Sequence, residues 1–156
     1  MAEHNRVTSS SRVQPDRHHE RNTRWARGTL KVVDASAMID VLSGTQRRAK
    51  LLPIFDDDLL APALLISEVY SFLKRMEATR RLSRRDAEQI AHALQQAPIE
   101  YLPTWPYAEQ MWNWRDNLSP YDSSYVALAD DLGAPLITTD SRLGRAAANL
   151  VTVISI

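Results

Sequence analysis

The sequence of 156 residues contains no cysteine, which excludes disulfide bonds, thiolate zinc sites and cysteine nucleophiles. Oxygen and imidazole groups remain as possible metal ligands. Long apolar runs are also missing, since no stretch approaches the ~18 residues that a membrane-spanning helix needs. The N-terminal segment has no apolar core of the kind found in signal peptides. We therefore expect a soluble, cytoplasmic protein with no membrane association.

A net charge is absent as well, but the charges are unevenly distributed. The chain carries 19 basic and 19 acidic side chains, of which six arginines and only three acids lie in residues 1–29. This segment is polar and lacks apolar periodicity, so we expect a disordered or loosely docked basic extension. Residues 30–156 form a single predicted domain with 13 basic and 16 acidic side chains. Such a domain is not steered as a whole onto nucleic acid, so any polyanion contact must be local.

Two stretches of the chain share the order strand, acid, helix. In the first, a buried strand predicted over 30–33 ends at Asp34, and a helix follows. In the second, a strand predicted over 135–138 leads to Asp140 and then to a helix over 141–148. Ligands of open parallel α/β sheets bind at the carboxyl ends of the strands, which makes both acids candidates for a site. Asp34 equally suits a helix N-cap, so a purely structural role stays open.

Two further acids are predicted on the inward-facing sides of helices. Glu68 lies beside the apolar stripe of a helix predicted over 64–76, where a buried carboxylate needs a cation. Asp122 occupies the third position of a helix that Ser119 caps, on the same face as Tyr125. A structural ion pair for Glu68 and a helix-capping role for Asp122 remain as alternatives.

Two other groups of residues have both a structural and a nucleic-acid interpretation. The densest basic cluster lies in a predicted helical hairpin and would suit a phosphate backbone, although a solvated hairpin tip needs no function. The possible RNA contacts in it are Arg80, Arg81, Arg84 and Arg85. Three tryptophans could stack on bases, but their helical spacing favours packing in the core or an interface. They are Trp105, Trp112 and Trp114.

The predicted strands alternate along the chain with one or more helices. This order indicates a wound α/β sheet with helices on both faces. If the two strands that end in acids are neighbours, all four acids meet in one pocket, where mutual repulsion requires a cation. Oxygen ligands without sulfur or nearby imidazole suit Mg²⁺ or Mn²⁺, ions that promote in-line displacement at phosphorus. Phosphodiester hydrolysis is the chemistry that this composition fits.

Four motifs, in matching order and spacing, resemble those of the PIN-domain ribonucleases. More narrowly, they resemble the VapC-type toxins of type II toxin–antitoxin systems. The motifs are Val33-Asp34-Ala35-Ser36, Ala61-Pro62 followed by Ser67-Glu68-Val69, the run from Tyr121 to Ala129, and Leu136-Ile137-Thr138-Thr139-Asp140. The resemblance covers residues 30–156 and implies a PIN domain there, a PIN-like three-layer α/β/α fold whose central parallel sheet has the order 3-2-1-4-5.

The resemblance also implies an activity, a cofactor and partners. It implies an endoribonuclease that hydrolyses RNA with water activated by Mg²⁺ or Mn²⁺. The implied catalytic and metal-binding acids are Asp34, Glu68, Asp122 and Asp140, and the implied supporting hydroxyls are Ser36 and Thr138. The resemblance further implies a homodimer and a cognate VapB-type antitoxin whose C-terminal segment blocks the site, often with an arginine.

Three alternatives differ from this interpretation. A catalytically silent PIN-like module that binds RNA or a protein partner is the main one, and the intact set of four acids argues against it. A receiver domain would need paired acids early in the chain and a lysine after the last strand. A phosphatase of the haloacid-dehalogenase type would need a second acid where Ser36 stands. The sequence supports neither of these two.

Overall fold

The computed structural model describes residues 30–56 and 58–156. The predicted basic extension, residues 1–29, lies outside the described residues, and so does Asp57. In the part of the chain that the structure describes, no helix is both long enough and apolar enough to cross a membrane.

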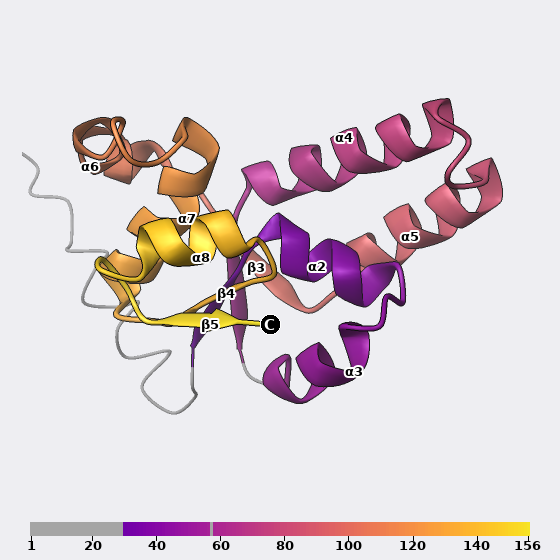
Figure 1. Ribbon diagram of the computed structural model, residues 1–156, viewed down its shortest axis with the longest axis horizontal. Coiled ribbons are helices and arrows are strands. Elements are labelled where there is room, and N and C mark those ends of the chain that lie inside the picture. The colour runs from indigo at the N-terminus through magenta and orange to yellow at the C-terminus, as the bar shows by residue number, and fades with distance from the viewer. Residues whose placement is uncertain (1–29, 57) are drawn as a thin grey trace, which may run out of the picture.

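Five short strands form one parallel sheet in the order β3-β2-β1-β4-β5 (Figure 1). The strands are β1 (Lys31–Val33), β2 (Leu59–Pro62), β3 (Ile99–Leu102), β4 (Leu136–Thr138) and β5 (Val153–Ser155). The central strand β1 pairs Val32 with Leu60 of β2 on one side and with Leu136 of β4 on the other. The predicted parallel sheet and its order 3-2-1-4-5 are confirmed. Val32 and Leu136 are fully buried, because helices cover both faces of the sheet.

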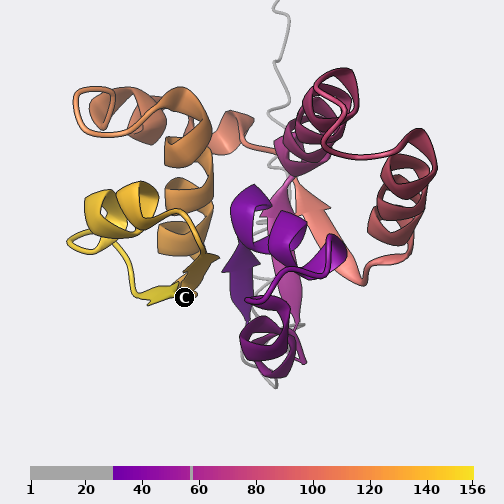
Figure 2. The ribbon, with the colours of Figure 1, turned by 45° about the vertical axis from the view of Figure 1, so that its right-hand side comes forward.

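Seven α-helices and two 3₁₀ helices connect the described strands. They are α2 (Ala35–Leu42), α3 (Arg48–Leu51), η1 (Leu52–Ile54), α4 (Leu64–Ala78), α5 (Arg84–Gln96), η2 (Trp105–Tyr107), α6 (Ala108–Asn113), α7 (Pro120–Leu132) and α8 (Ser141–Ala147). The chain runs from β1 to β3 toward one edge of the sheet, and from β3 through β4 to β5 toward the other. Right-handed crossovers therefore place α2 to α5 on one face and α6 to α8 on the opposite face, as Figure 2 shows. This arrangement is the predicted three-layer fold.

The ends of the helices follow local signals in the sequence. Ser119 caps α7 by accepting a hydrogen bond from the backbone N–H of Asp122 at 3.1 Å. Gly133 ends the same helix in the left-handed conformation, at φ 59°. Helix α4 continues past its predicted end to Ala78, and Arg80 then adopts φ 56° in the tight turn to α5. Together α4 and α5 form a hairpin that projects from the body of the molecule (Figure 1).

Two of the three tryptophans are exposed, so the prediction that they pack in the core is wrong for both. Trp105 has 78% of its surface exposed and Trp112 has 68%. Trp105 lies in η2 and Trp112 in the six-residue helix α6, so the two side chains do not share one face of a continuous helix as their spacing indicated. Arg115 lies over the ring of Trp112, 4.9 Å from its centre. Trp114 does pack against the core, and the interface alternative stays a prediction.

Candidate active site

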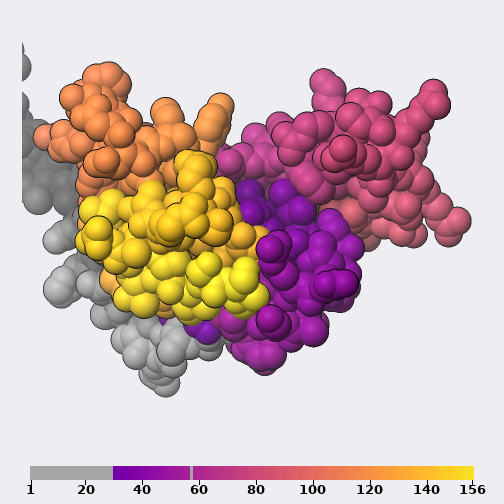
Figure 3. All heavy atoms as spheres, viewed as in Figure 1, coloured from indigo at the N-terminus to yellow at the C-terminus, as the bar shows by residue number. Residues whose placement is uncertain are grey.

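A pocket of about 790 Å³ lies at the carboxyl ends of β1 and β4. The chain leaves these neighbouring strands toward opposite edges of the sheet, which is where ligands of such sheets bind. Figure 3 shows an open cleft between the α6–α7 side of the molecule and the α4–α5 hairpin, with the start of α2 at its base. The four predicted acids line the pocket, namely Asp34, Glu68, Asp122 and Asp140. The structure thus brings them together, while their roles as ligands and catalysts stay predictions.

Asp34 is the most buried of the four acids, with 7% of its surface exposed. Its Oδ2 accepts hydrogen bonds from Ser36 Oγ at 2.5 Å and from Thr138 Oγ1 at 2.8 Å. Burial raises the pKa of Asp34, and these hydrogen bonds oppose the rise without cancelling it. The same oxygen accepts the backbone N–H of Ser36 at 3.3 Å and so caps α2. Asp34 therefore caps α2 and lines the pocket at the same time.

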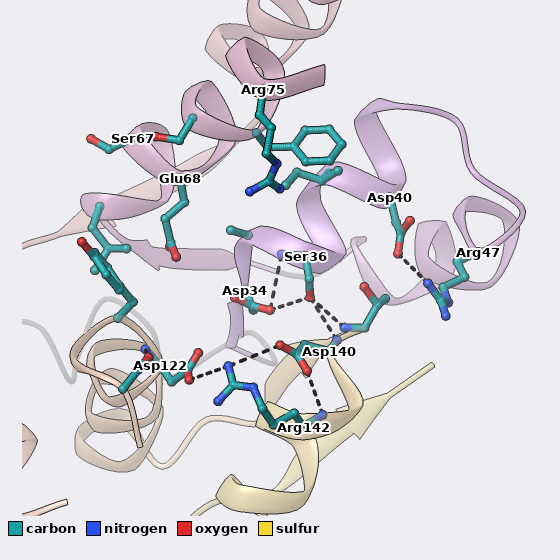
Figure 4. A pocket seen from close by; sticks show the side chains of 18 residues that line it. Asp34, Ser36, Asp40, Arg47, Ser67, Glu68, Arg75, Asp122, Asp140 and Arg142 are labelled. Atoms are coloured by element: carbon teal, nitrogen blue, oxygen red, sulfur yellow. Dashed lines mark hydrogen bonds and ion pairs between the residues drawn. The ribbon is translucent and has the colours of Figure 1, made fainter. Parts of the chain in front are cut away.

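Ser36 joins the two loops that carry Asp34 and Asp140 (Figure 4). Its Oγ donates to Asp34 and accepts the backbone N–H groups of Thr139 at 3.0 Å and Asp140 at 3.2 Å. Thr138 Oγ1, fully buried, donates to Asp34 and accepts the N–H of Asp140 at 3.0 Å. The two hydroxyls therefore fix the spacing of the acids, while their supporting role in catalysis stays a prediction.

Glu68 points into the pocket from the start of α4 (Figure 4). Its Oε2 accepts a hydrogen bond from the hydroxyl of Tyr125 on α7. Burial raises the pKa of Glu68, the Tyr125 hydrogen bond lowers it, and the charges of Asp34 and Asp122 raise it further. Burial and the bond to Glu68 raise the pKa of Tyr125, so this phenol stays protonated and donates. Glu68 forms no ion pair with any residue that the structure describes. The alternative that Glu68 belongs to a structural ion pair is therefore wrong within residues 30–56 and 58–156.

Asp122 and Asp140 flank the guanidinium of Arg142 (Figure 4). Arg142 Nη2 donates to Asp122 Oδ2 at 2.9 Å and lies 3.6 Å from Asp140 Oδ2. The Asp122 hydrogen bond and the charges of both acids raise the pKa of Arg142. Asp140 Oδ1 also accepts the backbone N–H groups of Arg142 and Leu143, at 2.7 and 3.2 Å, and so caps α8.

The side-chain chemistry of this pocket fits a hard divalent cation, although the acids as placed do not form a ready site for one. Among residues 30–56 and 58–156, no group of three or more acids or histidines is placed so that it could hold a metal ion. Asp122 and Asp140 contact Arg142 instead. Carboxylate oxygens without sulfur are the ligands that Mg²⁺ and Mn²⁺ prefer. The raised pKa values of Asp34 and Glu68 mark carboxylates that burial disfavours as anions, a cost that a cation would relieve.

The predicted RNA-contact arginines do not line the pocket. They lie at the far end of the α4–α5 hairpin (Figure 1), and they are Arg80, Arg81, Arg84 and Arg85. Arg84 forms an exposed ion pair with Glu88 at 3.0 Å. Three other arginines line the pocket, namely Arg47, Arg75 and Arg142. Arg47 pairs with Asp40, a fifth pocket acid, at 3.4 Å. RNA contact by the hairpin arginines stays a prediction.

Sequence reasoning missed Arg75 and Arg142 as pocket residues. Arg75 follows Glu68 by two helical turns, a spacing that puts both on one face of α4, so the signal was present in the sequence. Its guanidinium lies over the ring of Phe72, 5.8 Å from the ring centre. Arg142 gave no comparable signal, because its partner Asp122 lies 20 residues away on another helix.

Comparison with known proteins identifies the family of this chain. Residues 31–149 match the family model described as the PIN domain. Ribonuclease VapC9 of Mycobacterium tuberculosis is 36% identical over 112 residues, which cover 72% of this chain and 87% of that protein. Ribonuclease VapC3 of the same organism is 36% identical over 117 residues, which cover 74% of this chain and 85% of that protein. Ribonuclease VapC1, also of Mycobacterium tuberculosis, is 37% identical over 118 residues, which cover 74% of this chain and 89% of that protein.

Solved structures agree with this at the level of the fold. Mycobacterium tuberculosis VapC20, described as a toxin that cleaves the sarcin-ricin loop, superposes with a TM-score of 0.59 at 18% identity, covering 78% of this chain and 96% of that one. VapBC2 of Rickettsia felis, solved with a DNA fragment of its promoter, superposes with a TM-score of 0.57 at 9% identity. The match covers 81% of this chain and 98% of that one. The family model, the sequence relatives and the fold agree. The chain therefore belongs to the PIN-domain family, within its VapC group.

Proposed function

We propose that this protein is a Mg²⁺- or Mn²⁺-dependent endoribonuclease that acts as the toxin of a toxin–antitoxin pair. The observation that carries the proposal is the meeting of four carboxylates from separate elements in one pocket at the carboxyl edge of the sheet. The relatives VapC9 and VapC3 are named ribonucleases, and VapC20 is described as cleaving the sarcin-ricin loop, which supports RNA as the substrate class. Such a substrate would place the activity in the cytoplasm.

In this proposal the four acids hold the divalent cation and the neighbouring side chains hold the acids. The ligands are Asp34, Glu68, Asp122 and Asp140. When bound, such an ion would lower the pKa of the attacking water and stabilise charge on the phosphodiester oxygens. Ser36 and Thr138 hold Asp34 through its Oδ2, and Tyr125 holds Glu68 by donating its hydroxyl proton. These bonds limit the rotation of two carboxylates before any substrate arrives.

Arg75 is the residue that we assign to the RNA backbone. Its guanidinium points into the pocket from α4, beside Glu68 (Figure 4). It forms no ion pair with any described residue, so it is available to a phosphate. A cation beside the acids would attract a polyanion that the acids alone would repel.

The proposal includes a VapB-type antitoxin and a homodimer. The VapBC2 neighbour from Rickettsia felis supports the antitoxin, because that structure is named for the pair. Light scattering of the purified chain, alone and with the antitoxin, measures both assemblies. A strictly monomeric mass over the concentrations tested would contradict the homodimer.

The test of the proposed function is RNA cleavage by the purified chain with controlled metal. EDTA should abolish cleavage, and Mg²⁺ or Mn²⁺ should restore it. Asp34→Asn and Asp122→Asn should each reduce the rate ~10²-fold or more, because each removes charge from the cation site. Asp131→Asn is the matched control on α7, since Asp131 is exposed and accepts the Tyr107 hydroxyl at 2.9 Å, as an amide oxygen also can. Undiminished cleavage in EDTA would refute the metal dependence, and no cleavage with either metal would favour the silent PIN-like module.

A further inference from the structure

Arg142 fills the space between two of the four pocket acids. Its Nη2 lies 2.9 Å from Asp122 Oδ2 and 3.6 Å from Asp140 Oδ2, so one nitrogen faces both carboxylates. Arg142 lies two residues after Asp140, in the first turn of α8, and its backbone N–H donates to that same Asp140 side chain at 2.7 Å. The start of α8 thus places Asp140 in the pocket and Arg142 close to its carboxylate.

We propose that Arg142 competes with the divalent cation for Asp122 and Asp140, an inference that rests on the metal-dependent function proposed above. A Mg²⁺ ion that coordinates both acids must lie about 2.0–2.1 Å from an oxygen of each. The guanidinium nitrogen fills that region. Since a guanidinium stays protonated in proteins, it repels a metal ion at this distance. Metal binding to these two acids therefore requires Arg142 to move away.

Arg142 is the part of this cluster that can move at little cost. Its side chain is 60% exposed, whereas that of Asp122 is 13% exposed. Rotation about the side-chain bonds would carry the guanidinium into solvent and leave the backbone hydrogen bonds of α8 intact. Asp140 is held more firmly, because its carboxylate accepts two backbone N–H groups and its own N–H binds Ser36 and Thr138.

The competition is specific to Arg142 among the arginines that line the pocket. Arg47 pairs with Asp40, and Arg75 lies over the ring of Phe72. Among the described residues, neither Arg47 nor Arg75 forms an ion pair with any of the four acids. Removal of Arg142 should therefore change the affinity for metal in a way that removal of another arginine does not.

The expected effect is moderate, because the guanidinium is largely exposed. An exposed ion pair changes an equilibrium constant by a factor of about two to five, and Arg142 faces two acids. Replacing it with a neutral side chain should tighten Mn²⁺ binding by about 3- to 10-fold.

Calorimetric titration of the full chain with Mn²⁺ measures this directly. Arg142→Gln should bind Mn²⁺ about 3- to 10-fold more tightly than the wild type. Arg145→Gln is the matched control, because Arg145 is exposed on the same helix and does not line the pocket. Its affinity should stay within about twofold of wild type, since a distant exposed charge is screened by salt. Equal affinities in the two variants, or weaker binding by Arg142→Gln, would overturn the competition.

Thermal unfolding gives a second readout that needs no activity. In EDTA, Arg142→Gln should melt below the wild type, because Asp122 and Asp140 lose their counter-ion. The rise in Tm on adding Mn²⁺ should be larger for Arg142→Gln than for wild type, since a tighter ligand stabilises the native state more. An equal or smaller rise would contradict the proposal, and a cooperative transition shows that the variant folds.

Asp122→Asn separates a failure of this inference from a failure of the proposed function. Loss of Mn²⁺ binding in Asp122→Asn would establish the acidic site without reference to Arg142. An unchanged affinity in Arg142→Gln would then overturn the competition alone. If neither the wild type nor Arg142→Gln binds Mn²⁺, both the competition and the metal-dependent function are wrong.

Discussion

Asp34→Asn should make the protein more stable while it removes the proposed activity. The Asp34 carboxylate is buried, and that burial raises its pKa although Ser36 and Thr138 donate to it. An asparagine oxygen can accept the same two hydroxyl hydrogen bonds, and asparagine caps a helix as well as aspartate does. The substitution therefore removes one buried charge and leaves the start of α2 intact.

The expected gain is the difference between two opposing effects. Hydrogen bonds to a charged group contribute about 1.5–3 kcal/mol each and those to a neutral group about 0.5–1.5 kcal/mol, so weakening two of them costs about 2 kcal/mol. Desolvation of a buried ion costs several kcal/mol. The raised pKa of Asp34 shows that desolvation is the larger effect. We expect a net gain of about 1 kcal/mol, which raises Tm by about 2–4 °C in a chain of this size.

The pH dependence of the gain in stability distinguishes loss of the Asp34 charge from other causes of stabilisation. Because the pKa of Asp34 is above its ordinary value of 3.8, the folded state binds the proton more tightly than the unfolded chain does. The wild type therefore loses stability as the pH rises from 3.8 through the folded pKa, and the full cost is present above that folded pKa. The gain from Asp34→Asn should be largest at neutral pH, shrink as the pH falls through the folded pKa, and vanish below 3.8.

Thermal unfolding followed by circular dichroism, in EDTA at neutral pH and near pH 4, tests the prediction. EDTA is needed because a bound cation would stabilise the wild type selectively. A variant that melts below the wild type at neutral pH would show that the hydrogen bonds to the charged carboxylate outweigh its desolvation. A gain that does not change with pH would rule out the Asp34 charge as its cause.

Three further predictions follow from other contacts. Tyr125→Phe removes the hydrogen bond that lowers the pKa of Glu68, so the acidic limb of the pH–rate profile should move to higher pH and the neutral rate should fall about tenfold; an unmoved limb would contradict this. Arg75→Gln should raise KM for RNA several-fold at unchanged kcat, whereas Arg145→Gln, exposed on α8 outside the pocket, should not; an unchanged KM in Arg75→Gln would remove Arg75 from the RNA contact. Gly133→Ala should cost about 1 kcal/mol through its φ of 59° alone, because no atom lies within 4 Å of the added Cβ, and a Tm equal to wild type would refute that strain.

Local signals were enough to place the strands and the four acids. The bounds of β2 (Leu59–Pro62) and β3 (Ile99–Leu102) coincide with prolines in the sequence, since Pro62 ends the first strand and Pro98 and Pro103 flank the second. Asp34 and Asp140 follow directly from the rule that parallel strands end at one edge of a sheet. The sheet order came from the family resemblance and is confirmed. Helical periodicity alone placed Asp122 toward the core rather than the solvent.

Contacts between distant elements could not be predicted in the same way. Tyr125 and Glu68 are 57 residues apart, and their hydrogen bond depends on how α7 docks beside α4. Arg142 reaches Asp122 only because the starts of α7 and α8 meet at the pocket. The exposure of Trp112 has a related cause, since periodicity shows which residues share a face but not whether another element covers that face.

The Ser36 hydroxyl provides a built-in probe of the site for hydrogen exchange. The amide protons of Thr139 and Asp140 bind its oxygen, outside the regular ladders of helices and strands. Protons held in this way exchange with deuterated water only when the local bond opens. The exchange rate of the Thr139 amide therefore measures how often the loops that carry Asp34 and Asp140 separate with no substrate present, whereas the Asp140 amide is also held by Thr138 Oγ1. A molecule that binds across both loops would slow exchange at the two amides together, whereas one that binds at the hairpin tip would leave them unchanged.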